Sequence, residues 1–347
     1  MIIQIQTYKN NNKKYTIMKK QLIMLAYMLI VSIAAFAGTN SKILLQHDGG
    51  VKVYDSNQMT QALADAVKGD TLFLSEGTFA GFDLTKEVMI RGCGTTTIIT
   101  GAVKIAVAGN PTFSAPLLDA LKIDNSLTVT QPCKKLHIRK CWITGNISFS
   151  AKSEDVLIDR CSNDNTNRYT FSLSSNIISM TVINSNITYL SSNNANGGTV
   201  MFVNCNIPRR YSTISGQTFI NCIFGDSGYY NYGSNAYPLL NCILLNCLYN
   251  TSYSTDPNSY INSQVGNSQL QNCYGVDNGD VRLTNLSADE LLSSKYLGND
   301  GTIVGIYGGN TPFVADFIPS APKVTDSSVK LDLENKKLNV SLKVTAE

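Results

Sequence analysis

Charged residues and histidine are scarce in this sequence. Asp, Glu, Lys and Arg make up 15% of the 347 residues, whereas soluble domains usually carry roughly 25%, and the net charge at pH 7 is only +3. So small and scattered a positive charge argues against a nucleic-acid-binding surface. Two histidines and the lack of any Cys-x-x-Cys pair argue against a zinc site, and we expect no cofactor.

Long apolar runs are also missing beyond the N-terminal segment, and no later stretch reaches the roughly 20 residues that a membrane-spanning helix needs. At the N-terminus, Met18-Lys19-Lys20 precedes an apolar run over 22–35, and Ala35-Phe36-Ala37 has the small-x-small pattern of a signal-peptidase site. We therefore predict a signal peptide that is cleaved after Ala37. The mature protein would be secreted, periplasmic or on the cell surface, without a membrane span. Because Met18 begins a complete signal by itself, either Met1 or Met18 is the true start.

A short phrase recurs in the middle of the chain: an apolar pair, an Asn, a Cys or Ser, then another apolar residue. It occupies 182–187, 202–207, 219–224 and 239–244, and two earlier copies at 138–143 and 158–163 keep the Cys without the Asn. Aligned on positions 141, 161, 185, 205, 222 and 242, the copies are spaced by 20, 24, 20, 17 and 20 residues. Self-similarity at that period predicts a solenoid, in which each repeat buries its apolar face against its neighbours.

The pattern inside each repeat predicts which residues point inward. Residues three and five positions before the Cys are mostly apolar, and side chains alternate faces in a strand, so these should lie inside the coil. The Asn just before the Cys suits a tight corner, because Asn tolerates the left-handed conformation. Free Cys behaves as a small hydrophobe, and we expect buried free thiols at Cys141, Cys161, Cys205, Cys222 and Cys242. The alternative is a disulfide among Cys93, Cys133, Cys247 and Cys273.

The segment before the repeats carries a family resemblance. An amphipathic helix is predicted over 56–67, capped by Asp55 or Ser56, and Gly69-Asp70-Thr71-Leu72-Phe73-Leu74 and Glu76-Gly77-Thr78-Phe79 follow as turns and strands. With the strand over 87–92, this layout resembles the start of the right-handed parallel β-helix proteins of the pectin-lyase-like superfamily. The resemblance covers about 55–290 and implies an all-β solenoid with an N-terminal capping helix. That superfamily holds lyases, hydrolases, esterases and non-enzymes, so it implies little about function.

The C-terminal part resembles the end of secreted repeat proteins of Bacteroidetes-type bacteria. Gly305-Ile306-Tyr307-Gly308-Gly309 and Thr311-Pro312-Phe313 carry this resemblance, after a possible short helix over 287–292. A Pro-rich link over 319–322 and a strand pair over 329–333 and 338–344 should close the chain. We therefore divide the sequence into 1–37 (upstream extension and signal peptide), 38–68 (leader and capping helix), 69–290 (β-helix) and 291–347 (C-terminal cap).

The position two residues before the Cys should face outward, and its composition changes along the solenoid. Arg139 and Asp159 occupy it in the early repeats and would form a surface ion pair. The later repeats place an outer apolar stripe there, formed by Ile183, Val203, Ile220 and Leu240. Such a stripe indicates a covered surface. Its cover would be the chain's own C-terminal segment, or a partner or second copy; a shifted register would remove the stripe.

Candidate catalytic residues are few. A β-helix lyase needs a carboxylate cluster for a cation such as Ca²⁺ and a positioned base, and a hydrolase needs paired carboxylates. The densest charged group contains Asp155, Asp159, Asp164 and Arg168, with Arg139 one coil earlier. We interpret it as outward-facing surface charge, with His137 as a surface strand residue. Calcium is expected only if the protein is a lyase.

A tyrosine-rich stretch is the candidate ligand-binding site. Tyr229, Tyr230, Tyr232 and Tyr237 lie near Asp226 in a segment that leaves the repeat pattern. Exposed tyrosines suit sugar rings and protein interfaces, although they also pack loops onto a core. Arg209-Arg210, the compact basic pair, is interpreted as a solvated loop tip.

Together these patterns favour an exported, non-catalytic module for surface binding, adhesion or envelope structure. Its expected partner is a glycan or a surface protein, with the outer apolar stripe as a further contact surface. The alternative is a polysaccharide lyase or glycoside hydrolase that acts on an acidic polysaccharide.

Overall fold

A computed structural model describes residues 41–163, 170–192, 198–224, 238–250, 265, 267–276, 297–318, 323–332 and 337–345. The chain forms two compact units. One is Asn40–Phe317 and the other contains Ile318–Glu347, and each is described by itself. The predicted signal peptide over 1–37, the helix over 287–292 and the link over 319–322 lie outside the described residues.

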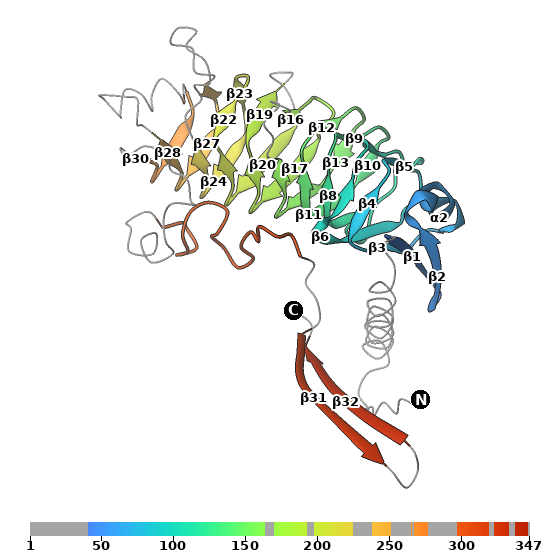
Figure 1. The fold of residues 1–347 in the computed structure, drawn as a ribbon. Coiled ribbons are helices and arrows are strands. Elements are labelled where there is room, and N and C mark those ends of the chain that lie inside the picture. Colours follow the sequence, from blue (N-terminus) through green and yellow to red (C-terminus); the bar gives the residue numbers. More distant parts are fainter. Residues whose placement is uncertain are drawn as a thin grey trace. The chain divides into compact units, whose positions relative to one another are not determined.

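The first unit is a parallel β-solenoid of about seven turns, which confirms the fold class (Figure 1). Successive coils stack through parallel strand pairs, each pairing one repeat with the next. The longest ladder consists of β6 (Met89–Ile99), β8 (Leu118–Ile123), β11 (His137–Ile143), β14 (Val156–Asp159), β17 (Ser179–Ile183), β20 (Thr199–Val203), β24 (Thr218–Ile220), β27 (Ile243–Leu245) and β29 (Gln269–Gln271).

Two further ladders complete the coil. One follows each Cys corner and contains β15 (Ser162–Asn163), β18 (Asn186–Ile187), β21 (Asn206–Ile207), β25 (Ile223–Phe224), β28 (Leu248–Asn250) and β30 (Tyr274–Val276). The other forms a separate sheet of β5 (Phe82–Leu84), β7 (Val103–Ile105), β9 (Leu127–Val129), β12 (Ile147–Phe149), β16 (Phe171–Leu173), β19 (Tyr189–Ser192) and β22 (Arg209–Arg210). Short pairs, such as β10 (Cys133–Lys134) with β13 (Ser153–Glu154), lie between the ladders.

The N-terminal end of the solenoid is covered by an antiparallel element and a short helix. Strand β1 (Lys42–His47) pairs with β2 (Gly50–Asp55) and with β3 (Thr71–Leu74), and β4 (Gly77–Phe79) then joins β6. The predicted helix is present as a 3-10 turn, η1 (Ser56–Gln58), followed by α2 (Met59–Asp65). It ends earlier than predicted because Ala66 is already extended. Met59 and Ala62 bury its inner face.

The interior confirms the inward positions that the repeats predict. In the predicted repeats the described residues three and five positions before the Cys, or before Ser185, are buried, and so are the five predicted thiols; all nine cysteines are free. Cys242 is buried and free as predicted, but its place in the column of stacked thiols is wrong. Ile220 pairs with Leu245, so Cys247 stacks after Cys222 and Cys273 after Cys247, whereas Cys242 lies at another corner.

The reason for this error is a tandem motif. Leu239-Leu240-Asn241-Cys242 is followed at once by Leu244-Leu245-Asn246-Cys247, and the two copies occupy two successive corners of one coil. Both corners are left-handed, with φ of 52° at Asn241 and 51° at Asn246. Strand β26 (Leu239–Leu240) pairs with β23 (Ile214–Ser215), so Leu240 is not part of the outer stripe and Leu245 takes its place.

The residues over 297–317, here called the closing strap, lie along the corner of the solenoid (Figure 1). The Asn184 side-chain amide donates to the carbonyl oxygens of Ile306 and Gly308, at 3.0 and 2.6 Å. Three strap residues form an apolar cluster with two solenoid residues that follow the corner Cys; its members are Ile223, Leu248, Ile303, Val304 and Ile306. At the other end, Phe317 stacks on Trp142 with ring centroids 6.4 Å apart. The C-terminal segment therefore covers Ile223 and Leu248, while Ile183, Val203 and Ile220 stay half-buried.

The second unit contains the predicted strand pair. Strands β31 (Lys323–Asp332) and β32 (Lys337–Thr345) form an antiparallel hairpin, longer than the sequence predicted, with one register shift between Val324 and Asp326. Among the residues that the structure describes, no helix is long and apolar enough to cross a membrane.

Candidate functional site

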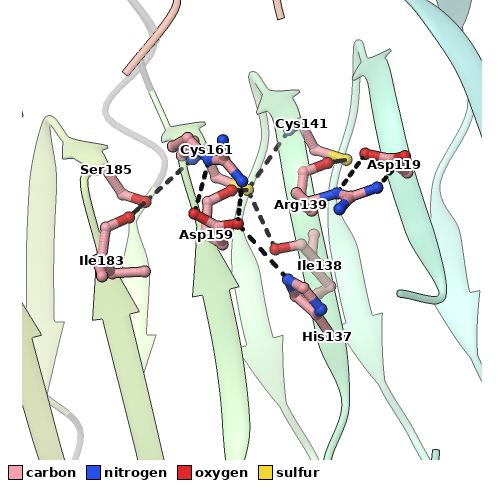
Figure 2. A network of polar contacts seen from close by, with 10 residues as sticks. Asp119, His137, Ile138, Arg139, Cys141, Asp159, Cys161, Ile183 and Ser185 are labelled. Carbon is pink, nitrogen blue, oxygen red and sulfur yellow. Dashed lines mark hydrogen bonds and ion pairs between the residues drawn. The ribbon is translucent and has the colours of Figure 1, made fainter. Parts of the chain in front are cut away.

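The predicted charged group belongs to a column of residues on the outside of the longest ladder. Register pairing stacks Arg91, Asp119, Arg139 and Asp159 in successive coils, so the charges alternate in sign; we call these four residues the charged ladder. Figure 2 shows Asp119, Arg139 and Asp159. The next coils continue the same column with Ile183, Val203, Ile220 and Leu245, here called the apolar ladder. The change from charge to apolar residues along one outer column, noted in the sequence, is therefore real.

Asp119 holds the centre of the charged ladder. Its side chain is 0% exposed and lies between two guanidinium groups. Arg139 donates from Nε to Oδ1 at 2.9 Å and from Nη2 to Oδ2 at 2.7 Å, and Arg91 Nε lies 3.1 Å from Oδ2. The hydrogen bond to Asp119 raises the pKa of Arg139, whereas burial lowers the pKa of Arg91. The predicted pairing of Arg139 with Asp159 is therefore wrong, because the guanidinium turns to the previous coil.

Asp159 is held by different partners. Arg160, at a left-handed corner with φ of 52°, donates from Nε and Nη2 to the two carboxylate oxygens at 2.9 and 2.7 Å. His137 Nε2 lies 3.8 Å from Asp159 Oδ2 (Figure 2). Burial alone would raise the pKa of Asp159, but the nearby His137 imidazole and the two hydrogen bonds from Arg160 outweigh it, so the pKa is lowered. The predicted surface residue His137 thus belongs to this group.

Asp155 lies apart from the charged ladder, at another corner. Its backbone is left-handed, with φ of 55°, and its Oδ1 accepts a hydrogen bond from Ser179 Oγ at 2.9 Å. It lines a notch of about 230 Å³ together with Lys135 and His137. Phe113 and Pro116 also belong to the lining of this notch. His137 therefore separates the notch from Asp159. Asp164 and Arg168, the other two members of the predicted group, lie outside the described residues.

This geometry suits charge neutralisation more than acid–base chemistry. Asp119 and Asp159 stand two coils apart, about 9.6 Å at the usual strand spacing, with Arg139 between them. Each carboxylate already accepts two hydrogen bonds from a guanidinium, which engage both of its oxygens. Within the described ranges, His, Cys, Asp and Glu side chains do not gather in threes as they would around a metal ion.

The tyrosine-rich candidate site, Tyr229, Tyr230, Tyr232, Tyr237 and Asp226, lies outside the described residues. Arg210, one coil earlier, is 2% exposed, so its interpretation as a solvated loop tip is wrong. It pairs in register with the inward residue Leu190, and its guanidinium carbon lies 5.6 Å from the centroid of the Phe224 ring. The face of Phe224 gives this cation an aromatic contact inside the coil.

Hydroxyl residues stack in register along the sheet that ends in β22, half-buried at Thr128 and Ser148 and buried at Ser172 and Ser191. The register stacks Thr128, Ser148, Ser172 and Ser191, here called the hydroxyl ladder. Thr128 Oγ1 and Ser148 Oγ are 3.2 Å apart. At the end of this ladder Tyr189 and Tyr211 stack with ring centroids 4.8 Å apart. Sequence reasoning missed this ladder, because Ser and Thr at coil spacing form no recognisable motif until the register is known.

Fold and site together define a parallel β-solenoid with an internally neutralised charged ladder and a stack of hydroxyl residues. Comparisons of the chain with family models, with curated proteins and with solved structures gave no match.

Proposed function

We propose that this protein is an exported, non-catalytic β-solenoid that binds glycan at a cell surface or in the envelope. The signal-like N-terminus and the resemblance of 56–101 to pectin-lyase-like proteins support export and an extracellular carbohydrate context. The resemblance of 305–313 to the end of secreted Bacteroidetes-type repeat proteins points in the same direction.

The pairing of the candidate carboxylates carries the non-catalytic part of the proposal. Asp119 is buried between Arg91 and Arg139, and Asp159 is held by Arg160. A general base must be free to accept a proton, and a carboxylate fixed by a bidentate guanidinium has its lone pairs engaged. These residues therefore neutralise one another's charges and join neighbouring coils.

The hydroxyl ladder supports glycan as the ligand class. Hydroxyl groups both donate and accept hydrogen bonds, as sugar hydroxyls do, and Thr128 and Ser148 are the half-buried members of this ladder, whereas Ser172 and Ser191 are buried. The tyrosine-rich segment follows β25, and in the proposal its aromatic faces take part in glycan binding. Repetition of the same groups at each coil suits a polymer better than a single small molecule.

A polysaccharide lyase or glycoside hydrolase that acts on acidic polysaccharide is the second candidate, and the notch beside His137 favours it. The notch places a histidine next to an exposed carboxylate, Asp155, and an exposed ammonium, Lys135. In this reading Lys135 binds a uronate carboxyl and His137 serves as the acid or base, with Ca²⁺ as a possible further requirement.

The test is incubation of residues 38–347 with a panel of neutral and acidic polysaccharides, with and without calcium. Retention on each glycan, unsaturated-product absorbance and new reducing ends are measured together. We expect retention without turnover, and weaker retention for Tyr230→Ala. Tyr230→Phe is the matched control, since it keeps the ring and should keep most of the binding.

Turnover that Asp159→Ala or His137→Ala abolishes would replace the proposal with the enzymatic reading. If neither retention nor turnover is found, glycan binding is wrong, and the solenoid is a scaffold for a protein partner.

A further inference from the structure

A groove lies at the N-terminal end of the solenoid. It has a volume of about 690 Å³ and runs between the helix α2 and the first strands of the separate sheet, β5 and β7. Small-molecule sites typically enclose about 300–1,000 Å³. Among the described residues, neither the charged ladder nor the notch beside His137 contributes to its lining.

Two stacked glycines make the floor of this groove. A Cβ on Gly81 would lie 2.5 Å from the Ala102 carbonyl oxygen, and a Cβ on Gly101 would lie 2.7 Å from the Gly81 nitrogen. Side chains are therefore excluded at both positions, and the coils meet backbone to backbone. The Phe82 amide donates to the Ala102 carbonyl at 3.1 Å, which fixes the two coils at this point. The floor is thus main chain, with room above it.

The wall formed by the helix is fixed in place by Lys86. Its ammonium group donates to the carbonyl oxygens of Leu63, Ala64 and Ala66, at 3.1, 2.7 and 2.7 Å. These carbonyls belong to the end of α2, where a cation is also favoured by the helix dipole. Because the helix is tied to the strand side by three hydrogen bonds, the groove exists before any ligand binds.

The rim combines opposite charges with apolar surface. Lys104 Nζ and Asp83 Oδ1 are 3.6 Å apart, and their side chains are 51% and 56% exposed. A loose, exposed pair of this kind contributes little to stability, so both groups are available to a ligand. Leu63 and Ala102 provide apolar surface beside them.

We infer that this groove binds one or two residues of a neutral glycan. The ammonium donates to sugar hydroxyl oxygens and the carboxylate accepts from sugar hydroxyls, while Leu63 and Ala102 contact the C–H face of the ring. A purely apolar ligand would remove water from the charged pair, and the opposite charges of Lys104 and Asp83 give an acidic sugar no net attraction. This inference rests on the proposed function and adds a defined sugar site at the other end of the solenoid.

Affinity electrophoresis of the full exported chain through gels with neutral polysaccharide tests the inference. We expect Ala102→Trp, which fills the groove, and Lys104→Gln to weaken retention at least tenfold. Lys134→Gln is the matched control, because Lys134 also pairs with an exposed carboxylate, Glu154, but lies outside the groove. Circular dichroism melting verifies that each variant is folded, and Lys104→Gln provides a test if Ala102→Trp does not fold.

Unchanged retention of both groove variants, with loss for Tyr230→Ala, would overturn the inference and leave the proposed function intact. Retention on acidic glycans alone would overturn the neutral class. Wild-type protein that binds no glycan would overturn both.

Discussion

The two halves of the outer column use the same backbone geometry with opposite chemistry. In the early coils Arg91, Asp119 and Arg139 pair charge with charge, and in the later coils Ile183, Val203 and Ile220 stack apolar side chains. Both halves keep equivalent residues in register at each coil. The parallel ladder therefore tolerates either solution, provided that each side chain finds a partner of its own kind in the coil above or below.

The two solutions differ in how easily a single change disrupts them. A buried charge that loses its partner keeps its desolvation cost without the compensating attraction. An apolar side chain that loses a neighbour gives up only part of its contact area, at about 25 cal/mol per Å². The charged ladder should therefore respond to single substitutions more strongly than the apolar ladder.

The largest expected effect comes from Asp119→Ala. It removes the fully buried carboxylate and leaves Arg91 and Arg139 facing each other, so we expect a loss of ~3–5 kcal/mol in the free energy of unfolding. Urea denaturation monitored by circular dichroism measures the change. Asp124→Ala is the matched control, because Asp124 is half-exposed and its Oδ1 lies 3.4 Å from Lys122 Nζ. This substitution should change the free energy of unfolding by less than ~1 kcal/mol. Equal effects of the two substitutions would contradict the comparison.

A smaller effect is expected where the closing strap meets the corner. Asn184→Gly keeps the left-handed corner, where φ is 47°, but removes the two hydrogen bonds to Ile306 and Gly308. We expect a loss of ~1–2 kcal/mol, against a few tenths for Asn241→Gly at an exposed corner of the same conformation. Urea denaturation of both variants gives the difference, and limited proteolysis reports whether the strap is released. Similar losses for both would show that the strap bonds contribute nothing.

Replacing the charged residues of the column by apolar ones should lower the unfolding free energy less than removing one charge from the charged ladder. The triple variant Arg91→Ile, Asp119→Val, Arg139→Ile places apolar residues at three early positions of the column, and Asp159 keeps Arg160 as its partner. We expect an unfolding free energy within ~1 kcal/mol of wild type, because well-packed apolar residues often replace buried ion pairs without loss. Its denaturation midpoint is compared with that of Asp119→Ala. A triple variant as unstable as the single one would mean that these coils specifically require charge.

The smallest effect is expected from acid titration of Asp159. Its pKa in the folded protein lies below the ordinary value of 3.8, so the ionised group stabilises the fold above about pH 4. That contribution is lost as the pH falls through the folded pKa. Unfolding free energies measured between pH 5 and pH 2 should fall less steeply for Asp159→Asn than for wild type. Parallel pH profiles would show that His137 and Arg160 do not stabilise the carboxylate.

Much of the coil was predictable because it depends on local rules. Alternation placed Ile138 and Val182 inside, and Asn before the thiol marked left-handed corners such as Asn204, with φ of 52°. The capping helix and the C-terminal hairpin followed from equally local patterns. The mistake at Leu240 arose because two copies of one motif serve two corners of the same coil, and both corners select the same residues.

The candidate site was less predictable, since its partners come from different coils. Nothing in the local sequence tells whether Arg139 turns to Asp119 or to Asp159, because both stand one coil away. The burial of Arg210 and the position of His137 beside Asp159 likewise depend on residues about one coil away in the sequence. The hydroxyl ladder is built from Thr128, Ser148 and Ser172, which share no motif.

The sequence by itself determined the coil: a period of about 20 residues, inward apolar positions and corner asparagines, since each follows from short-range backbone preferences and burial. The tertiary structure decided which residues of neighbouring coils stack on one another. Ion pairs, the closing strap and the groove beneath α2 depend on contacts across coils, and a spacing change of a few residues moves every such contact to a new partner.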